Sequence, residues 1–191
     1  MKSLLHWAPV ASGFLVLVLS MFVAVLTVSQ RNSQSNIATT QNLNTKASEQ
    51  TASLSLSPAS GSFSLGAAAP AVGIVLDSGG KSVDGVDVII NFDPKKVQVA
   101  GVKVATTSLF EQFPQNSIDN VKGQIRFSAL TFNPRPVTGI VGTFAFQSGF
   151  AGPVNFNFDF TYGSTKDSNI AEHGTAKDIL GKVENGSYTI R

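Results

Sequence analysis

Few residues in this sequence could perform chemistry, and they are not grouped as a reaction requires. The predicted folded region, residues 53–191, contains one histidine, His173, within the loop-like segment AEHGTAK. Nucleophilic hydrolysis needs a nucleophile beside a base that a third group orients. The sequence has no Gly-x-Ser-x-Gly elbow, no phosphate-binding loop and no histidine pair at metal-ligand spacing. We therefore predict no catalytic residues and no enzyme activity.

The carboxylates offer two further kinds of site. A pair for glycoside hydrolysis could be drawn from Asp87, Asp93, Glu111 and Asp159, but the sequence fixes no separation between them. A structural Ca²⁺, which takes about six to eight oxygen ligands, is an alternative near Asp77, Asp84 and Asp93, with Asp87 close by. No loop has the alternating acidic spacing typical of a calcium loop, so we interpret these aspartates as turn caps and expect no cofactor.

Other polar side chains suit recognition of a sugar. Asn155, Asn157, Asp159 and Tyr162 follow or alternate with apolar residues in and after PVNFNFDFT, where they could hydrogen-bond or stack on carbohydrate. Most of the 14 phenylalanines fall at predicted inward positions and are assigned to the core. Only Tyr162 and Tyr188 remain as aromatic platforms in the predicted domain, so stacking on crystalline polysaccharide has weak support.

A strand with two chemically different sides must position the central group of polar residues. In GVDVIINFDP the inward set is Val86, Val88, Ile90 and Phe92, and the outward set is Asp87, Ile89, Asn91 and Asp93. Pro94 ends the strand because proline has no N–H for the ladder. The segment DSGGK before this strand is predicted to turn the chain.

Similar short runs, separated by glycine, proline and asparagine, predict the other strands. They are residues 54–56, 72–76, 97–104, 123–130, 137–147, 153–161, 179–180 and 188–190. Residues 106–113 are expected to form a short helical or coiled segment. About nine strands within residues 53–191 predict one all-β domain, a β-sandwich with a single core.

The N-terminal part has a different composition. Residues 8–28 are 21 residues without a charge, about enough to cross the 30 Å hydrocarbon core of a bilayer as a transmembrane helix. Residues 1–7 would then be a short cytoplasmic N-terminus, and polar residues 29–52 a flexible, disordered linker. We expect a single-pass cell-membrane protein whose domain lies on the extracytoplasmic side; a cleaved secretory signal is the alternative.

The charge balance argues against nucleic acid as a partner. The whole chain has a net charge of +2, but lysine plus arginine equals aspartate plus glutamate within residues 53–191. No cluster of basic residues with interleaved aromatics occurs there. The basic excess belongs to the N-terminal anchor and linker.

Several of these segments, taken in order, resemble a cohesin domain, a fold related to carbohydrate-binding modules of families 2 and 3. The resemblance covers about residues 54–190. It rests on SLSLSPASGSFSLG, on VDGVDVIINFDP followed by KKVQVAGV, and on the later strands GQIRFSAL, GTFAF and GPVNFNF. Order and spacing agree throughout.

The resemblance implies a nine-stranded jelly-roll sandwich that binds a dockerin through one exposed sheet face, in assemblies that degrade polysaccharide outside the cell. Cohesins often carry Asn-x-Asp on that face; Asp87 matches the aspartate, whereas Gly85 stands in place of the asparagine. The acidic position expected near Thr131 or Phe132 is absent. Outward alternation assigns the partner-binding face to Asp87, Ile89, Asn91, Arg126 and Ser128. Direct carbohydrate binding, a structural spacer or adhesin role, and a merely solvated face remain alternatives.

Overall fold

The computed structural model describes residues 50–67, 71–105 and 109–191. These residues form ten strands, joined by turns and loops, and no helix. The predicted all-β class is confirmed. The strands are β1 (Ala52–Ser57), β2 (Ser60–Phe63), β3 (Val72–Phe92), β4 (Val97–Val104), β5 (Gln112–Asp119), β6 (Gln124–Ser148), β7 (Gly152–Phe158), β8 (Asn169–Glu172), β9 (Leu180–Glu184) and β10 (Gly186–Ile190).

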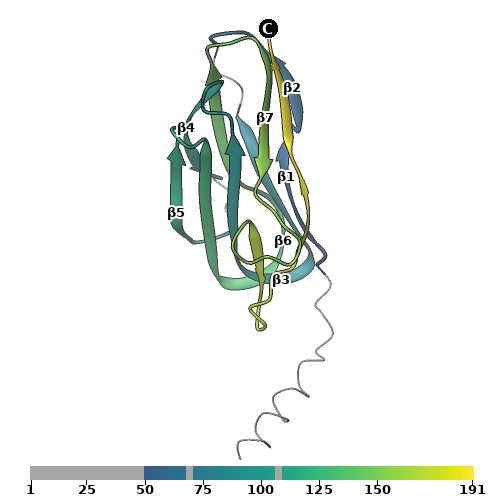
Figure 1. Ribbon diagram of the computed structural model, residues 1–191. Coiled ribbons are helices and arrows are strands. Elements are labelled where there is room, and N and C mark those ends of the chain that lie inside the picture. Colours follow the sequence, from purple (N-terminus) through teal and green to yellow (C-terminus); the bar gives the residue numbers. More distant parts are fainter. Residues whose placement is uncertain (1–49, 68–70, 106–108) are drawn as a thin grey trace, which may run out of the picture. The chain divides into compact units, whose positions relative to one another are not determined.

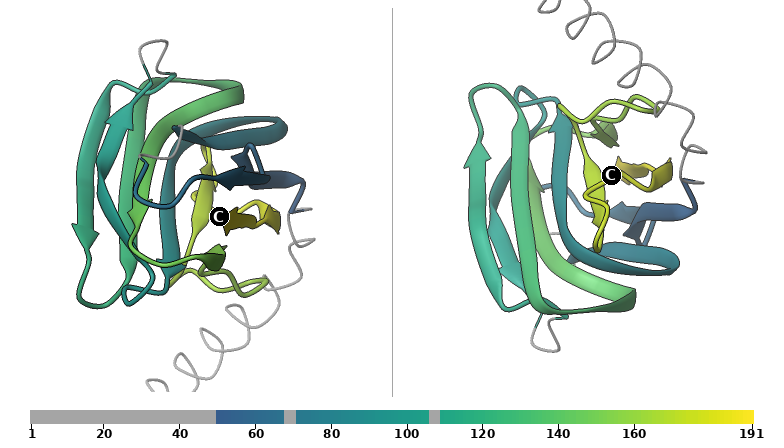
Figure 2. Two further views of the ribbon diagram at one scale, coloured as in Figure 1. Left: turned by 90° about the horizontal axis from the view of Figure 1, so that it is seen from above. Right: turned by 90° about the horizontal axis from the view of Figure 1, so that it is seen from below.

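Two long strands, β3 and β6, connect two layers that face each other across the core (Figures 1 and 2). The N-terminal part of β3, residues 72–77, pairs with β1 and with the C-terminal part of β6. The C-terminal part of β3 pairs with β7 and β8 on one side and with the N-terminal part of β6 on the other. Strand β4 extends the first layer because it pairs with the C-terminal part of β6. Strand β5 extends the second layer because it pairs with the N-terminal part of β6.

The predicted turn at DSGGK is wrong, because β3 continues through this segment. The ladder to β6 shifts register between Asp77 and Ser82, and Gly79 and Gly80 have φ of 60° and 81°. Glycine adopts such angles without steric cost, so the strand bends from one layer to the other without ending. The hydroxyl of buried Ser78 accepts the Val137 amide at 3.0 Å, which replaces a ladder bond at the bend.

The inward residues predicted from the alternation in GVDVIINFDP and in PVNFNFDFT contribute to the core. Val86, Val88, Ile90 and Phe92 of β3 are buried, as are Val154, Phe156 and Phe158 of β7. Side chains from both layers pack there as one cluster. Burial of this apolar surface is the main favourable contribution to folding.

Of the helical or coiled segment expected over residues 106–113, the described residues 109–111 belong to no helix or strand, and no helix forms. Residues 106–108 lie outside the described residues, and Gln112 begins β5 rather than continuing a helix. The cause is Pro114, which disfavours helical geometry at Phe113 before it and has no N–H for a helix. Phe110 is buried against the core, as its apolar character predicted.

The predicted N-terminus (residues 1–7), the predicted membrane segment (8–28) and residues 29–49 of the predicted linker (29–52) lie outside the described residues, and Ala52, placed in the linker, begins β1. Among residues 50–67, 71–105 and 109–191, no helix is long and apolar enough to cross a membrane.

Candidate binding face

Four neighbouring strands, in the order β8, β3, β6 and β5, turn one side away from the core. We call this side the outer face. Residues directly opposite each other in an antiparallel ladder point to the same side of the sheet. The ladder between β3 and β6 pairs Asp87 with Ser128 and Ile89 with Arg126, and it pairs Asn91 with Gln124. The structure therefore brings the five predicted partner-binding residues together on the outer face.

These five residues differ in accessibility. Asp87 and Arg126 are exposed and Asn91 is half-buried, whereas Ile89 and Ser128 are each only 7% exposed. The backbone of Ile89 accepts the Asp159 amide at 2.8 Å and exchanges two hydrogen bonds with the buried Ser168 hydroxyl. A partner on the outer face would thus reach Asp87, Asn91 and Arg126 directly, but little of Ile89 or Ser128.

A chain of hydrogen bonds fixes the arginine on this face. Arg126 Nε donates to Gln124 Oε1 at 2.7 Å, and Gln124 Nε2 donates to Asn91 Oδ1 at 3.0 Å. Within the described part of the chain, neither Arg126 nor Asp87 forms an ion pair. The outer face therefore offers one positive and one negative group that an incoming partner can pair.

The sequence prediction missed the two flanking strands of the outer face. Gln115 and Ser117 of β5 are exposed opposite Ser128 and Arg126, and Asn169 of β8 lies opposite Asp87. These strands are short or contain proline and few apolar residues, so their alternation is weak. Only pairing with β6 and β3 makes them strands.

An apolar end of the outer face was also missed. Leu130 and Phe132 continue the outward series of β6 and are 45% and 73% exposed. Leu130 lies over Gly85 of β3, where a Cβ would come within 2.5 Å of the leucine Cδ2. The outward period of Arg126 and Ser128 would have reached both residues if it had been continued along the strand.

Glu111 holds the strand beside Phe132. Its carboxylate accepts the Phe132 amide at 3.0 Å and the Asn133 side-chain amide at 3.4 Å. Hydrogen bonds from the Thr131 hydroxyl and the Phe132 amide lower the pKa of Glu111. The ionised carboxylate thus fixes the backbone that carries the exposed ring.

The four candidate sugar-contacting residues are divided by the structure. Asn157 pairs with Asn91 across β7 and β3, and Asn155 lies two residues before it, on the same side of β7. Both line an open hollow of about 370 Å³. Asp159 and Tyr162 instead follow the other end of β7 and do not line this hollow. Tyr188 is buried in the core, so it offers no platform.

The aspartates considered for calcium have separate roles. Asp77 accepts the Gly79 amide at the bend within β3, and Asp93 accepts the Lys95 amide as the cap of the turn after β3. Asp84 contacts His173, with 2.7 Å between Oδ1 and Nδ1. Nowhere in residues 50–67, 71–105 and 109–191 do three acidic or histidine side chains gather as a metal site requires.

Comparisons with known proteins identify the fold. The third cohesin of ScaC from Acetivibrio cellulolyticus, solved with a ScaB dockerin, superposes with a TM-score of 0.59 at 18% identity over 73% of this chain and 98% of that chain. The cohesin of OlpC from Clostridium thermocellum, in a type I cohesin–dockerin complex, gives 0.58 at 12% identity over 76% and 96%. A non-cellulosomal cohesin from Archaeoglobus fulgidus gives 0.50 at 14% identity over 73% and 91%. No protein-family model and no curated protein matches the sequence.

Proposed function

We propose that the protein is a non-catalytic binding module that holds a dockerin-like protein on its outer face. The fold supports this proposal, because the structural neighbours of the chain are cohesin domains. The observation that carries the proposal is the combination of exposed Leu130 and Phe132 with the unpaired charges of Asp87 and Arg126 on one side of four strands. Protein interfaces commonly combine such an apolar anchor with polar groups at its edge.

The departure at Gly85 defines the kind of partner. Leu130 covers the position where the resemblance would place an asparagine side chain. A partner therefore meets an apolar surface there, and needs an apolar side chain in place of a hydrogen-bonding one. This difference favours a dockerin-like protein with its own specificity.

The setting of the module is part of the proposal. We propose that residues 8–28 anchor it in the cell membrane and that the domain acts outside, in assemblies that bind or degrade polysaccharide. The uncharged length of residues 8–28 supports the anchor. We expect the full chain to stay in the membrane fraction during alkaline carbonate extraction, and its domain to be cleaved by protease added outside the cell. Release of the chain by carbonate would contradict the anchor.

A binding experiment tests the partner. Calcium-loaded recombinant dockerins from the same organism are titrated into the full chain by isothermal calorimetry. We expect a dockerin to bind. Phe132→Ala and Arg126→Ala should each reduce its affinity at least about tenfold, or about 1.4 kcal/mol, because each removes a side chain that anchors the interface.

Ile140→Ala is the matched control. Ile140 is 43% exposed, close to the value for Leu130, but it lies on the part of β6 that pairs with the first layer. Its truncation should leave the affinity unchanged. Dockerin binding that survives both outer-face variants would show that the partner binds elsewhere on the domain. Absence of any dockerin binding would reject the proposed partner class.

A further inference from the structure

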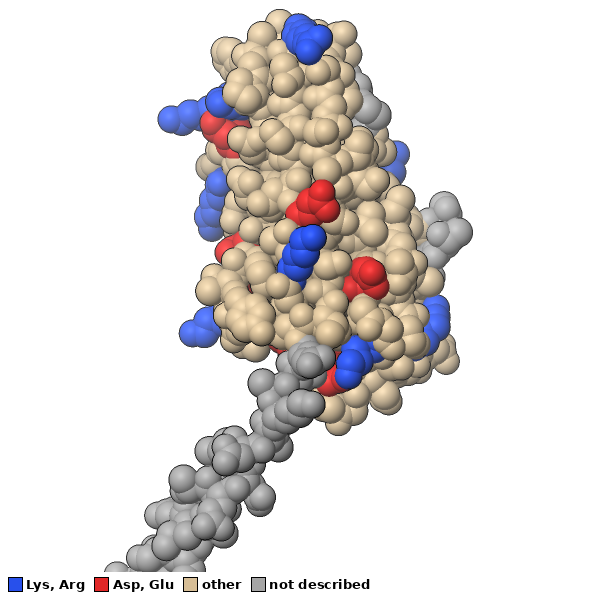
Figure 3. Space-filling model, turned by 90° about the vertical axis from the view of Figure 1, so that its right-hand side faces the viewer, with Lys and Arg blue, Asp and Glu red and all other residues tan. Residues whose placement is uncertain are grey.

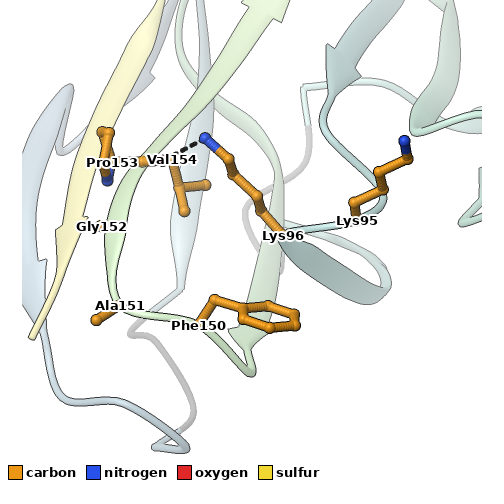
Figure 4. Close-up of a pocket in the computed structure, with 7 residues that line it drawn as sticks. All are labelled: Lys95, Lys96, Phe150, Ala151, Gly152, Pro153 and Val154. Atoms are coloured by element: carbon orange, nitrogen blue, oxygen red, sulfur yellow. Dashed lines mark hydrogen bonds between the residues drawn. The ribbon is translucent and has the colours of Figure 1, made fainter.

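An apolar hollow lies at the start of β7, between the exposed ring of Phe150 and the side chain of Lys96 (Figure 4). Its remaining lining comes from Lys95 and from residues 151–154. Phe150 is 66% exposed, in the connection between β6 and β7. The volume of this open hollow is about 320 Å³, which is enough for a sugar ring.

The hollow is built on fixed backbone. The buried hydroxyl of Ser148 accepts the Phe150 amide at 3.1 Å and lies 2.8 Å from the carbonyl oxygens of both Phe150 and Lys96. One side chain thus ties together the two segments that form opposite walls. A large apolar ring is held in water on an ordered turn, where it adds nothing to the core.

A second, polar hollow continues from the first. The two share Lys96 and Pro153, and the second is lined further by Asn91, Asn155 and Asn157. The side-chain amides of Asn155 and Asn157 are exposed and form no hydrogen bond with any other described residue, so they are free for a ligand. Together the hollows make a groove with an aromatic wall at one end and a row of amides at the other; we call it the β7 groove.

The charge at the junction is positive. Neither Lys95 nor Lys96 forms an ion pair with a carboxylate in the part of the chain that the structure describes. Lys96 Nζ donates to the Pro153 carbonyl oxygen at 3.4 Å, whereas Lys95 points away from the ring (Figure 4). Asp93 also lines the polar hollow, and one of its oxygens accepts the Lys95 amide. Lys96 lines both hollows and is therefore the cation at their junction.

We propose that the β7 groove binds an acidic sugar chain of the uronic-acid class. A pyranose ring has an apolar face that packs on an aromatic ring, and its hydroxyl groups form hydrogen bonds with amides. Phe150 provides the ring, Asn155 and Asn157 provide the amides, and Lys96 lies between them, where it pairs with a sugar carboxylate. All of these groups belong to the β7 groove.

This site is separate from the apolar end of the outer face. Phe150 precedes β7, whereas Leu130 and Phe132 lie on β6. The two surfaces share Asn91, which pairs with Asn157 across β3 and β7. Their anchoring residues differ, so a substitution at Phe132 or at Phe150 can abolish one interaction without the other.

The test uses the full chain in mild nonionic detergent, with hexagalacturonate as the acidic probe and cellohexaose as the neutral one. We expect calorimetry to show binding of hexagalacturonate that weakens with added salt, because a lysine–carboxylate contact is screened. Phe150→Ala and Lys96→Gln should each reduce the affinity about tenfold, and circular dichroism should show both variants folded.

Two matched variants control for loss of an exposed ring and of a charge. Phe132→Ala removes an exposed phenylalanine from the outer face, and Lys103→Gln removes an exposed lysine from β4. Both should bind hexagalacturonate as the unmodified chain does. Equal binding of the neutral and acidic probes would overturn the acidic class, and no binding, or binding that survives Phe150→Ala, would overturn the site. None of these outcomes depends on a dockerin.

Discussion

At the scale of single residues, Gly85 and Leu130 act as one packing unit across β3 and β6. Leu130 lies over the glycine, and a Cβ there would also come within 2.8 Å of the Ala129 carbonyl oxygen. The backbone oxygen cannot rotate away as a side chain can. The close approach of these strands therefore requires glycine, which explains on physical grounds why the asparagine suggested by the resemblance has no room here.

Gly85→Ala should consequently destabilise the fold. We expect a loss of about 1–3 kcal/mol in the free energy of unfolding, the usual cost of overpacking, measured by urea denaturation. Adding Leu130→Ala should recover only part of the loss, because the contact with the Ala129 carbonyl oxygen remains. Gly149→Ala is the control, since nothing lies within 4 Å of its added Cβ. Equal stability of the Gly85 and Gly149 variants would contradict this account.

At the scale of elements, side chains complete the ladder where two strands separate. Strand β4 faces β5 without a continuous backbone ladder, and Asn120, next to the end of β5, bridges the gap. Its Oδ1 accepts the Val99 amide and its Nδ2 donates to the Val99 carbonyl, both at 2.9 Å. Asn116 donates to the Val102 carbonyl at 2.8 Å. The two asparagines thus provide hydrogen-bond partners for backbone groups along an edge of β4 where no strand pairs with them.

Removing this bridge should loosen β4 specifically. Asn120→Ala leaves the amide and carbonyl of Val99 without these partners, and we expect a loss of about 1–3 kcal/mol from two partly buried hydrogen bonds. Hydrogen exchange at the Val99 amide should become faster than in Lys103→Ala, a variant of an exposed residue on the same strand. If the exchange rate at Val99 does not change, the side-chain bridge does not protect this edge.

The elements with strong alternation were predictable from sequence, and those that depend on their neighbours were not. The series Val86, Val88, Ile90 and the series Val154, Phe156, Phe158 face the core as predicted. Strands β2, β5 and β8 have weak alternation and form because a neighbouring strand offers unpaired backbone groups. The bend of β3 looked like a turn because glycine serves both structures.

The outer face was predictable in part for the same reason. Period-two spacing assigned Asp87 and Arg126 to the outward side of their own strands, but only the register of β3 with β6 shows that the two strands are neighbours. Ile89 is buried, and its amide donates to the hydroxyl of Ser168, which lies 79 residues away along the chain. The sequence did not predict Leu130 and Phe132 as part of the outer face, because apolar residues are usually assigned to the core. Exposure, unlike alternation, is a property of the assembled sheet.

At the scale of the whole molecule, the polar surface and the aromatic core have separate roles. On the side of the molecule that Figure 3 shows, acidic and basic groups are few and interspersed. No large field of one sign is seen on this side, and recognition there would depend on shape and local groups rather than long-range steering. The core is instead rich in rings: Phe146, Phe156 and Tyr188 pack pairwise with centroids 4.9–6.0 Å apart. These rings connect β6, β7 and β10.

Tyr188 makes this core sensitive to alkali. Its side chain is 1% exposed, its hydroxyl donates to the Pro58 carbonyl at 2.7 Å, and burial raises its pKa from 10.0 to about 12. The folded protein therefore favours the neutral phenol more than the unfolded chain does. The resulting stability is complete below pH 10 and is lost as the pH rises toward 12.

Tyr188→Phe should remove this part of the alkaline destabilisation. At neutral pH the variant loses the hydrogen bond to Pro58, so we expect it to be less stable by about 1–2 kcal/mol. Between pH 10 and 12 the unmodified chain should lose its advantage, because its phenol must ionise in the core or the fold must open. Urea denaturation at a series of pH values measures the difference, with Tyr162→Phe as the exposed control that keeps the full slope. A constant difference between the two chains across this range would show that the phenol does not couple folding to pH.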